Sequence, residues 1–152
     1  MKAGIDYTGI CVVFYYHDGD GNLLMHKRSA ACRDENHRWD CGSGQLEFGE
    51  NPEQGVLREI MEEYGCAGTI EKKLEPVSII RTQQEKKTHW LAIPFIIKVN
   101  KDEVSINEPE AMDDIGWFSL HQLPSPLHSS VEWYIPQIMP ELKQLMYNKE
   151  TA

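Results

Sequence analysis

Four glutamates gather around one predicted helix in the first half of the chain. Glu59, Glu62 and Glu63 follow one another at helical spacing, and Glu50 lies in the loop just before the helix. Because residues three and four apart share one face of a helix, the three helical carboxylates are expected to face the same way and to repel one another. Such a cluster either solvates an exposed helix face or binds a cation that removes the repulsion, and both interpretations stay open on these residues alone.

The residues around the acids predict where this helix begins and ends. Asn51 is a suitable N-cap, Pro52 suits the first helical position, and Gln54 stands where a capping box has Glu or Gln. Gly65 is a natural residue to end the helix. The preceding loop, residues 42–49, contains glycines that let backbone approach a ligand closely. A glycine-containing loop followed by an amphipathic helix is therefore expected to position the carboxylates.

The same segment resembles the Nudix box of the Nudix hydrolases. That box is a Gly, five residues, a Glu, seven residues, and then Arg-Glu-aliphatic-any-Glu-Glu-any-Gly-aliphatic, and residues 44–66 follow this spacing. Cys66 takes the last aliphatic position, where a buried Cys behaves as a small hydrophobe. The flanking stretches RWDCGSGQLEFGE and IGWFSLHQLP also look like the family, although Gly42, Ser43 and Gly44 replace the Pro-Gly-Gly of many relatives. The matching positions are Gly44, Glu50, Arg58, Glu59, Ile60, Glu62, Glu63 and Gly65.

The resemblance implies a fold and a chemistry. The implied fold is an α/β (α+β) architecture, an α/β/α sandwich in which helices cover a mixed sheet, and residues 1–152 are expected to form one Nudix hydrolase domain. The implied reaction is Mg²⁺-dependent hydrolysis of a nucleoside diphosphate linked to another moiety, with water attacking a phosphorus. Mn²⁺ is expected to substitute for Mg²⁺.

Each box residue has an expected role within this resemblance. Mg²⁺ takes a few carboxylates and keeps several waters, and the expected set around it is Glu50, Glu59, Glu62, Glu63 and Gly44. Glu62 is the first candidate for the base that accepts the water's proton, with Glu59 and Glu63 as alternatives. Arg58 is expected to orient Glu50 or Glu59.

Residues outside the box are candidates for substrate binding. Upstream cations can clamp phosphates, or they can be solvated loop charges, since Asp34 and Glu35 interrupt their run. Aromatic side chains can stack on a base, or they can belong to the core. The candidates are Lys27, Arg28, Arg33, Arg38, Trp39, Trp90, Trp117 and Phe118, with Arg28 and Arg38 first among the cations. An acidic run from Glu108 to Asp114 either is a solvated loop or assists catalysis or recognition of the nucleobase.

The identity of the substrate is less constrained. Residues 81–84 contain neither the tyrosine typical of dinucleoside polyphosphate hydrolases nor the proline typical of ADP-ribose hydrolases. A MutT-like nucleoside triphosphate pyrophosphohydrolase is therefore the leading hypothesis. The alternatives are an ADP-ribose or sugar-nucleotide pyrophosphatase and, from another class, a Nudix module that senses a nucleotide without cleaving it. The intact box glutamates favour an enzyme.

The composition limits the kinds of partner that the protein is expected to bind. A formal net charge of −9 and a pI near 5.1 argue against binding to a nucleic acid polymer, whose phosphates require clustered Lys and Arg. No apolar run suits a membrane span, and the first residues make a poor signal peptide, so a cytoplasmic location is expected. The stretch VEWYIPQIMPELKQLM either packs on the core or supplies a homodimer face.

The patterning also predicts the remaining elements. A hairpin of strands is expected over 9–17 and 23–27, followed by a polar loop over 29–38. Extended segments are expected at 39–41, 45–48, 69–81, 88–99 and 115–119, with a polar loop over 100–114. A helical region over 131–148 is expected to be interrupted by Pro136 and Pro140.

Overall fold

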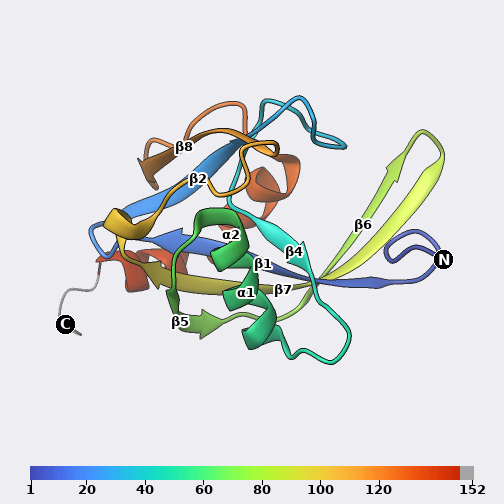
Figure 1. Ribbon diagram of the computed structural model, residues 1–152, viewed down its shortest axis with the longest axis horizontal. Coiled ribbons are helices and arrows are strands. Elements are labelled where there is room, and N and C mark those ends of the chain that lie inside the picture. The colour runs from blue at the N-terminus through green and yellow to red at the C-terminus, as the bar shows by residue number, and fades with distance from the viewer. Residues whose placement is uncertain (148–152) are drawn as a thin grey trace.

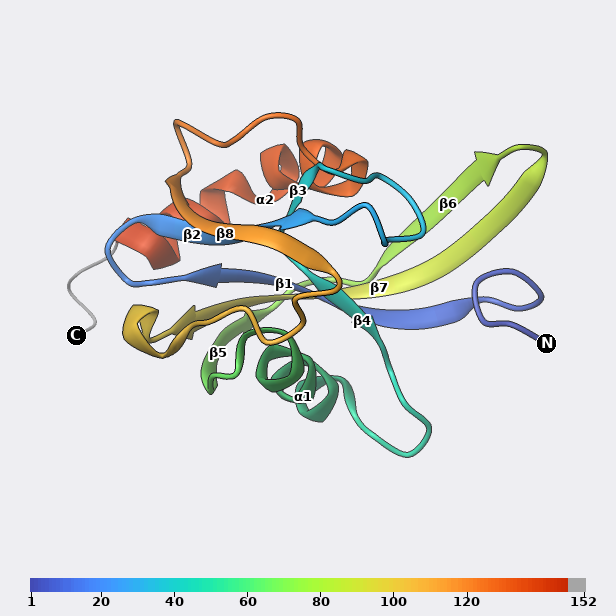
Figure 2. The same ribbon diagram turned by 45° about the horizontal axis from the view of Figure 1, so that its top comes forward.

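A mixed β-sheet with one helix on each side forms the fold of the computed structural model, which describes residues 1–147 (Figures 1 and 2). The expected α/β sandwich is confirmed. No helix in this described part is both long enough and apolar enough to span a membrane. The elements are β1 (Gly9–His17), β2 (Asn22–Arg28), β3 (Trp39–Asp40), β4 (Ser43–Gln45), α1 (Pro52–Tyr64), β5 (Gly68–Lys73), β6 (Val77–Gln83), β7 (Lys86–Val99), a 3-10 turn (Lys101–Glu103), β8 (Met112–Ser119) and α2 (Ser129–Tyr147).

The long strand β7 organises the sheet. β7 pairs in parallel with β1 from Gly9↔Trp90 to His17↔Lys98, whereas its pairings with β5 and β6 are antiparallel. The main path through the sheet is β3-β2-β1-β7-β5, with β4 on β1, β6 on β7 and β8 on β2. The β6–β7 hairpin reaches well beyond the body of the molecule (Figure 1). One end of the fold is therefore bordered by β1, β4 and this hairpin.

Helix α1 has the predicted ends. The Asn51 side chain accepts a hydrogen bond from the Gln54 backbone at 2.9 Å, and the Gln54 side chain accepts one from the Asn51 backbone at 3.0 Å. Gly65 has a φ of 65°, which a glycine adopts without steric cost. Val56 and Ile60 are buried on the face that packs against the sheet. This burial fixes the rotation of the helix, so Glu63 lies on the same buried face and Glu59 and Glu62 follow on the adjoining arc.

Helix α2 differs from the expectation, because Pro136 and Pro140 do not interrupt it. Both prolines are exposed, so water is available to the carbonyls that they leave without a helical donor. The opposite face packs on the sheet through an apolar cluster, whose burial outweighs the local cost of the prolines. The buried residues of this face are Val131, Tyr134, Ile135, Ile138, Leu142 and Met146. Residue 148, which the prediction included, lies outside the described residues.

The strand predictions hold except at two places. The first hairpin, its following loop and the strands around 69–81 and 88–99 are confirmed within a few residues. The extended segment predicted at 45–48 is wrong, since β4 covers Ser43–Gln45, where it pairs with Cys11–Val13 of β1. β8 begins at Met112 rather than 115, because Met112 still pairs with Arg28 of β2.

Candidate functional site

Arg58 lies at the centre of the box carboxylates. Its Nε donates to Glu50 Oε2 at 3.0 Å and its Nη2 to Glu50 Oε1 at 2.6 Å, a two-pronged contact with the loop acid. Its Nη1 donates to Glu59 at 2.8 Å and to Glu62 at 3.3 Å. The hydrogen bonds from Arg58 lower the pKa of Glu50 to about 2. Arg58 therefore keeps Glu50 ionised and ties the loop to the helix.

Glycine backbone passes directly against the other carboxylates. A Cβ at Gly44 would overlap the carboxyl carbon of Glu59, and a Cβ at Gly42 would lie 2.9 Å from Glu63 Oε2. Gly42 also has a φ of 138°, which disfavours any other residue. The loop therefore needs glycine at both positions for its backbone to reach the acids.

Glu63 is the most deeply buried of the four acids. Only 8% of it is exposed, and its Oε2 has no hydrogen-bond partner among the described residues. Burial, and then the charges of Glu59 and Asp40, raise the pKa of Glu63 well above its ordinary value. An ionised carboxylate here is costly unless a cation compensates it. Oxygen donors are also what Mg²⁺ prefers, so the residues present fit such an ion.

A loop acid that the sequence left open approaches the same cluster. The charge of Glu108 contributes to raising the pKa values of Glu59 and Glu63, after the larger effect of burial. The loop reaches α1 because Asn107 Nδ2 donates to the Glu62 carbonyl at 2.9 Å and the Asn107 backbone to the Glu63 carbonyl at 3.0 Å. Helical spacing cannot reveal this residue, since it returns from a distant part of the chain.

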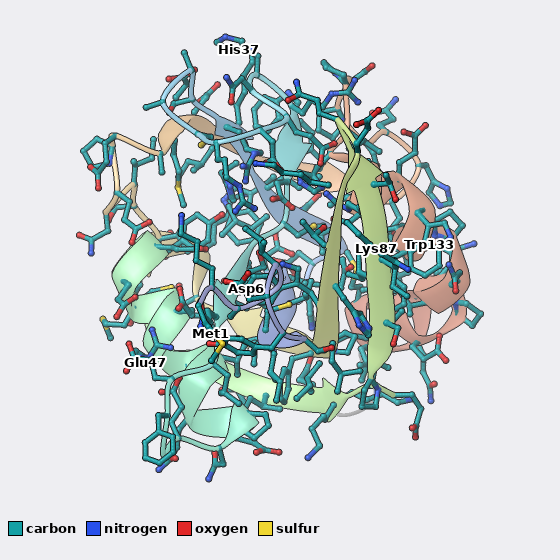
Figure 3. The ribbon with its side chains drawn as sticks, turned by 90° about the vertical axis from the view of Figure 1, so that its right-hand side faces the viewer. Met1, Asp6, His37, Glu47, Lys87 and Trp133 are labelled. Carbon is teal, nitrogen blue, oxygen red and sulfur yellow. The ribbon has the colours of Figure 1, made fainter. Side chains whose placement is uncertain are left out.

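A cavity of about 1030 Å³ adjoins this cluster. Ser43 and Gly44 line it, and Gly44 touches Glu59, so the backbone of β4 separates the cavity from the helical acids. Figure 3 looks at this end of the molecule, with His37 of the β2–β3 loop at the top, Lys87 and Trp133 at one side and Glu47 at the other. The cationic residues along the cavity are Arg28, Arg33, Arg81 and Lys86.

Few of the substrate-binding candidates line this cavity. Arg28 does so, and its guanidinium contacts Asp34 at 3.0 Å and Asp40 at 3.5 Å. Arg33, which the sequence also offered, lines it too. Arg38 lies elsewhere, since its Nη1 donates to the Leu127 carbonyl at 3.0 Å.

Trp90 also lines the cavity, whereas the other aromatic candidates and Lys27 lie away from the cavity lining. Trp39 packs edge-on against Phe118, with ring centroids 5.1 Å apart, beside the apolar cluster under α2. Trp117 packs on the core under α1, and the Lys101 ammonium lies 5.4 Å from its ring centroid. Lys27 is half-buried on β2, between partner strands β3 and β8. Trp39 and Trp117 therefore follow the core interpretation rather than base stacking in this cavity.

The β6–β7 hairpin supplies cavity residues that the sequence analysis largely missed. Arg81 pairs with Thr88 and Ile79 with Trp90, and these alternate positions share the face that borders the cavity. The only signal in the sequence was an alternation of side-chain character with a period of two residues along this segment. That signal identifies a strand face, but it does not tell which site the face borders.

Comparison with known proteins agrees with this geometry. A family model described as NUDIX domain matches residues 8–141. The putative mutator protein MutT4 of Mycobacterium tuberculosis is 25% identical over 104 residues, which cover 68% of this chain and 42% of that protein. The NAD-capped RNA hydrolase NudC of Stutzerimonas stutzeri is 30% identical over 97 residues, which cover 63% of this chain and 33% of that protein. The chain thus spans less than half the length of these curated relatives.

A solved structure shows the same likeness over nearly its whole length. The crystal structure of the MutT NUDIX hydrolase from Burkholderia pseudomallei superposes with a TM-score of 0.74 at 27% identity, covering 88% of this chain and 99% of that one. The chain belongs to the Nudix family, as the resemblance of residues 44–66 indicated.

Proposed function

We propose that this protein is a divalent-cation-dependent hydrolase that cleaves a diphosphate linkage in a nucleotide. The observation that carries the proposal is the buried carboxylate of Glu63, whose Oε2 has no hydrogen-bond partner among the described residues and lies against Gly42, a residue that lines the large cavity. A purely structural helix gains nothing from such a group, whereas a cation site needs it. The family membership and the intact set of box glutamates support an enzyme over a sensing module.

The proposed cation is Mg²⁺, with Mn²⁺ as a substitute, held by the box acids and the Gly44 backbone: Glu50, Glu59, Glu62, Glu63 and Gly44. When bound, the ion polarises phosphoryl oxygens and lowers the pKa of a coordinated water. Arg58 orients Glu50 and Glu59 through bonds of 2.6 and 2.8 Å. Its second role is to offset part of the charge of the cluster in the absence of the ion.

Glu62 is the proposed base, which accepts the proton of the attacking water at a carboxylate oxygen. Its side chain is 48% exposed, and both of its contacts with Arg58 are 3.3 Å long. Glu62 is therefore the box acid that can most easily turn toward a water. Glu59 and Glu63 remain the alternative bases, and Glu108 is an additional candidate because it faces the same acids.

The proposed substrate is a nucleoside triphosphate, which would be converted into a nucleoside monophosphate and pyrophosphate. The MutT names of the relatives and the cationic cavity wall support this assignment. An ADP-ribose or sugar-nucleotide substrate is the second candidate, because a cavity near 1030 Å³ has room for a moiety beyond the nucleotide. Catalysis in the cytoplasm and assembly into a homodimer stay predictions from the sequence.

A substrate panel tests the proposal. The protein would be incubated with Mg²⁺ or Mn²⁺ and nucleoside triphosphates, ADP-ribose, sugar nucleotides or dinucleoside polyphosphates, and products would be separated by chromatography. Reaction in ¹⁸O-labelled water would locate the bond that breaks. Loss of turnover is expected in Glu62→Gln and Glu63→Gln, and not in Glu53→Gln, which changes an exposed acid of the same helix that pairs with Lys73 at 2.8 Å. Absence of turnover throughout the panel would favour the nucleotide-sensing module.

A further inference from the structure

A loop carboxylate outside the box connects three walls of the cavity. Glu35 lies between β2 and β3, and only 13% of its side chain is exposed. Its Oε1 accepts a hydrogen bond from the Ser129 backbone at 2.7 Å, its Oε2 accepts one from the Ser129 hydroxyl at 3.0 Å, and His128 Nε2 lies 2.8 Å from the same Oε2. Arg81 Nη1 donates to the same Oε2 at 3.2 Å. One side chain thus joins the β2–β3 loop, the start of α2 and the β6–β7 hairpin.

The hydrogen bond made by Nδ1 of His128 determines which of its two nitrogens carries the proton in the neutral ring. Nδ1 accepts a hydrogen bond from the Ser130 backbone at 3.1 Å, where the amide must be the donor. In the neutral ring the proton is therefore assigned to Nε2, which lies beside Glu35 Oε2. Both the imidazole and the carboxylate thus accept amide hydrogens of the first turn of α2, where a negative charge is favourable.

The loop that carries Glu35 depends on these contacts for its shape. Glu35 and His37 have φ values of 47° and 64°, in the left-handed region that non-glycine residues rarely adopt. Such a backbone persists where tertiary contacts over-determine it. Arg33 and Asp34 of the same loop line the cavity, as do Arg81 and His128, although Glu35 itself does not. Loss of the Glu35 contacts would free cavity residues on three separate segments.

The same group is not a cation site, although it holds three potential ligands. Asp34, Glu35 and His128 bring one ligand atom each within 4.8 Å of one another. Arg28 already pairs with Asp34 at 3.0 Å, and Arg81 pairs with Glu35. Both nitrogens of His128 are also in use. The two guanidinium groups supply the positive charge that an ion would otherwise bring.

We propose that Glu35 is a positioning residue for nucleotide binding, which fixes the β2–β3 loop and presents the Arg81 guanidinium to an anionic group of the substrate. The inference rests on the proposed function, since it takes the cavity as the substrate site. Arg81 uses one of its five donors on Glu35, so other donors stay available for a phosphate. Glu35 acts through Arg81 and the loop, and it takes no part in bond cleavage.

The kinetic test replaces the carboxylate by its amide. Glu35→Gln keeps the size of the side chain and an oxygen for Ser129, but it removes the charge that holds Arg81 and His128. We expect KM for the cleaved nucleotide to rise about tenfold or more, with kcat within about threefold of the wild type, because ground-state placement is lost while the box is intact. Glu53→Gln, the same change in an exposed ion pair on α1, should leave both constants unchanged. Unchanged KM in Glu35→Gln, or a kcat that falls as much as KM rises, would overturn the proposal.

A second variant separates positioning from general loss of structure. Arg81→Gln leaves the Ser129 and His128 contacts of Glu35 in place, and it should raise KM to a similar extent. In the double variant, the effects should be clearly less than additive if Glu35 acts through Arg81. Full additivity would contradict that route.

Hydrogen exchange of the ligand-free protein tests the anchoring role of Glu35 independently of the identity of the substrate. Amides in residues 29–38 and at the start of α2 should exchange at least about tenfold faster in Glu35→Gln than in Glu53→Gln. This measurement needs no nucleotide, and KM is taken with whichever nucleotide of the panel is cleaved. If the substrate is not a nucleoside triphosphate, both measurements therefore still apply. Identical exchange rates in the two variants would overturn the anchoring role.

Discussion

At the scale of single residues, the buried carboxyl of Glu63 lowers the stability of the fold when no cation occupies the proposed site. Burial raises the pKa of its carboxyl in the folded protein, so the metal-free fold loses stability as pH rises above the ordinary carboxyl value of about 4.3. Glu63→Gln removes the charge. We expect the variant without metal to unfold at a higher temperature than the wild type at pH 7, by calorimetry in the presence of a chelator.

The pH dependence provides the control for this prediction. The advantage of Glu63→Gln should grow by about 1.4 kcal/mol per pH unit between the unfolded and folded pKa values, because one proton separates the two states there. Below about pH 3, where the carboxyl is protonated in both states, the two proteins should be almost equally stable. A variant that is less stable than the wild type at pH 7 would show that Glu63 has a structural partner.

Gly44 offers a second prediction at this scale. Its φ is not in the left-handed region, so alanine strains no backbone, but the added Cβ would overlap the Glu59 carboxyl. Displacement of a reacting or ligating group by about 1 Å can lower a rate by about 100-fold. We expect Gly44→Ala to lose turnover by about that factor and to bind Mn²⁺ more weakly, as measured by calorimetry. Ser43→Ala is the matched control, and equal losses in both variants would count against the steric explanation.

Individual residues of the site were predictable from the sequence to very different degrees. The box acids and Arg58 follow from fixed spacing within one helix and its loop, where local geometry alone decides which groups meet. Trp39 and Trp117 could not be assigned in the same way, because an aromatic residue on a strand has the same pattern whether it faces a core or a ligand. Arg81 was missed because it meets the β2–β3 loop and, through Glu35, the start of α2, two segments that are distant from it in the sequence.

At the scale of elements, the capping box of α1 connects helix stability to the site. Asn51 caps the helix that carries three of the four box acids. Loss of an N-cap side chain typically costs about 1 kcal/mol. Asn51→Ala should therefore lower the free energy of unfolding by about that amount in urea titrations, whereas Asn51→Ser should lose much less. A similar loss in both variants would mean that the cap contributes through something other than its hydrogen bond to Gln54.

The two helices also differ in how far the sequence predicts them. The start and end of α1 are set by local chemistry, and they appear where Asn51 and Gly65 indicated. The continuity of α2 depends on an apolar face that packs along the sheet, which is a tertiary effect. Local propensity favours a break at Pro136 and Pro140. The segment is helical because packing outweighs that propensity, and a single sequence does not show what a helix will pack against.

At the scale of the whole molecule, the acids of the proposed cation site would link cation binding to pH and to global stability. The pKa values of Glu59, Glu63 and Glu108 are raised, first by burial and then by neighbouring acids, so cation binding must displace the protons that they retain. A ligand that binds only the folded state stabilises it more as its affinity increases. Mg²⁺ should therefore raise the unfolding temperature more at pH 8 than at pH 5.5.

Calorimetric titration with Mg²⁺ or Mn²⁺ checks the same linkage directly. The binding heat should differ between two buffers of different ionisation enthalpy, in the direction that indicates release of protons to the buffer. The number of protons released per ion should decline as pH rises through the raised pKa values. Glu63→Gln should release fewer protons and bind the ion more weakly, while Glu53→Gln should match the wild type, because Glu53 is exposed and pairs with Lys73. Proton uptake, or an unfolding temperature that Mg²⁺ raises equally at both pH values, would mean that the ion does not bind at the buried acids. The fold would then carry their electrostatic cost for another reason.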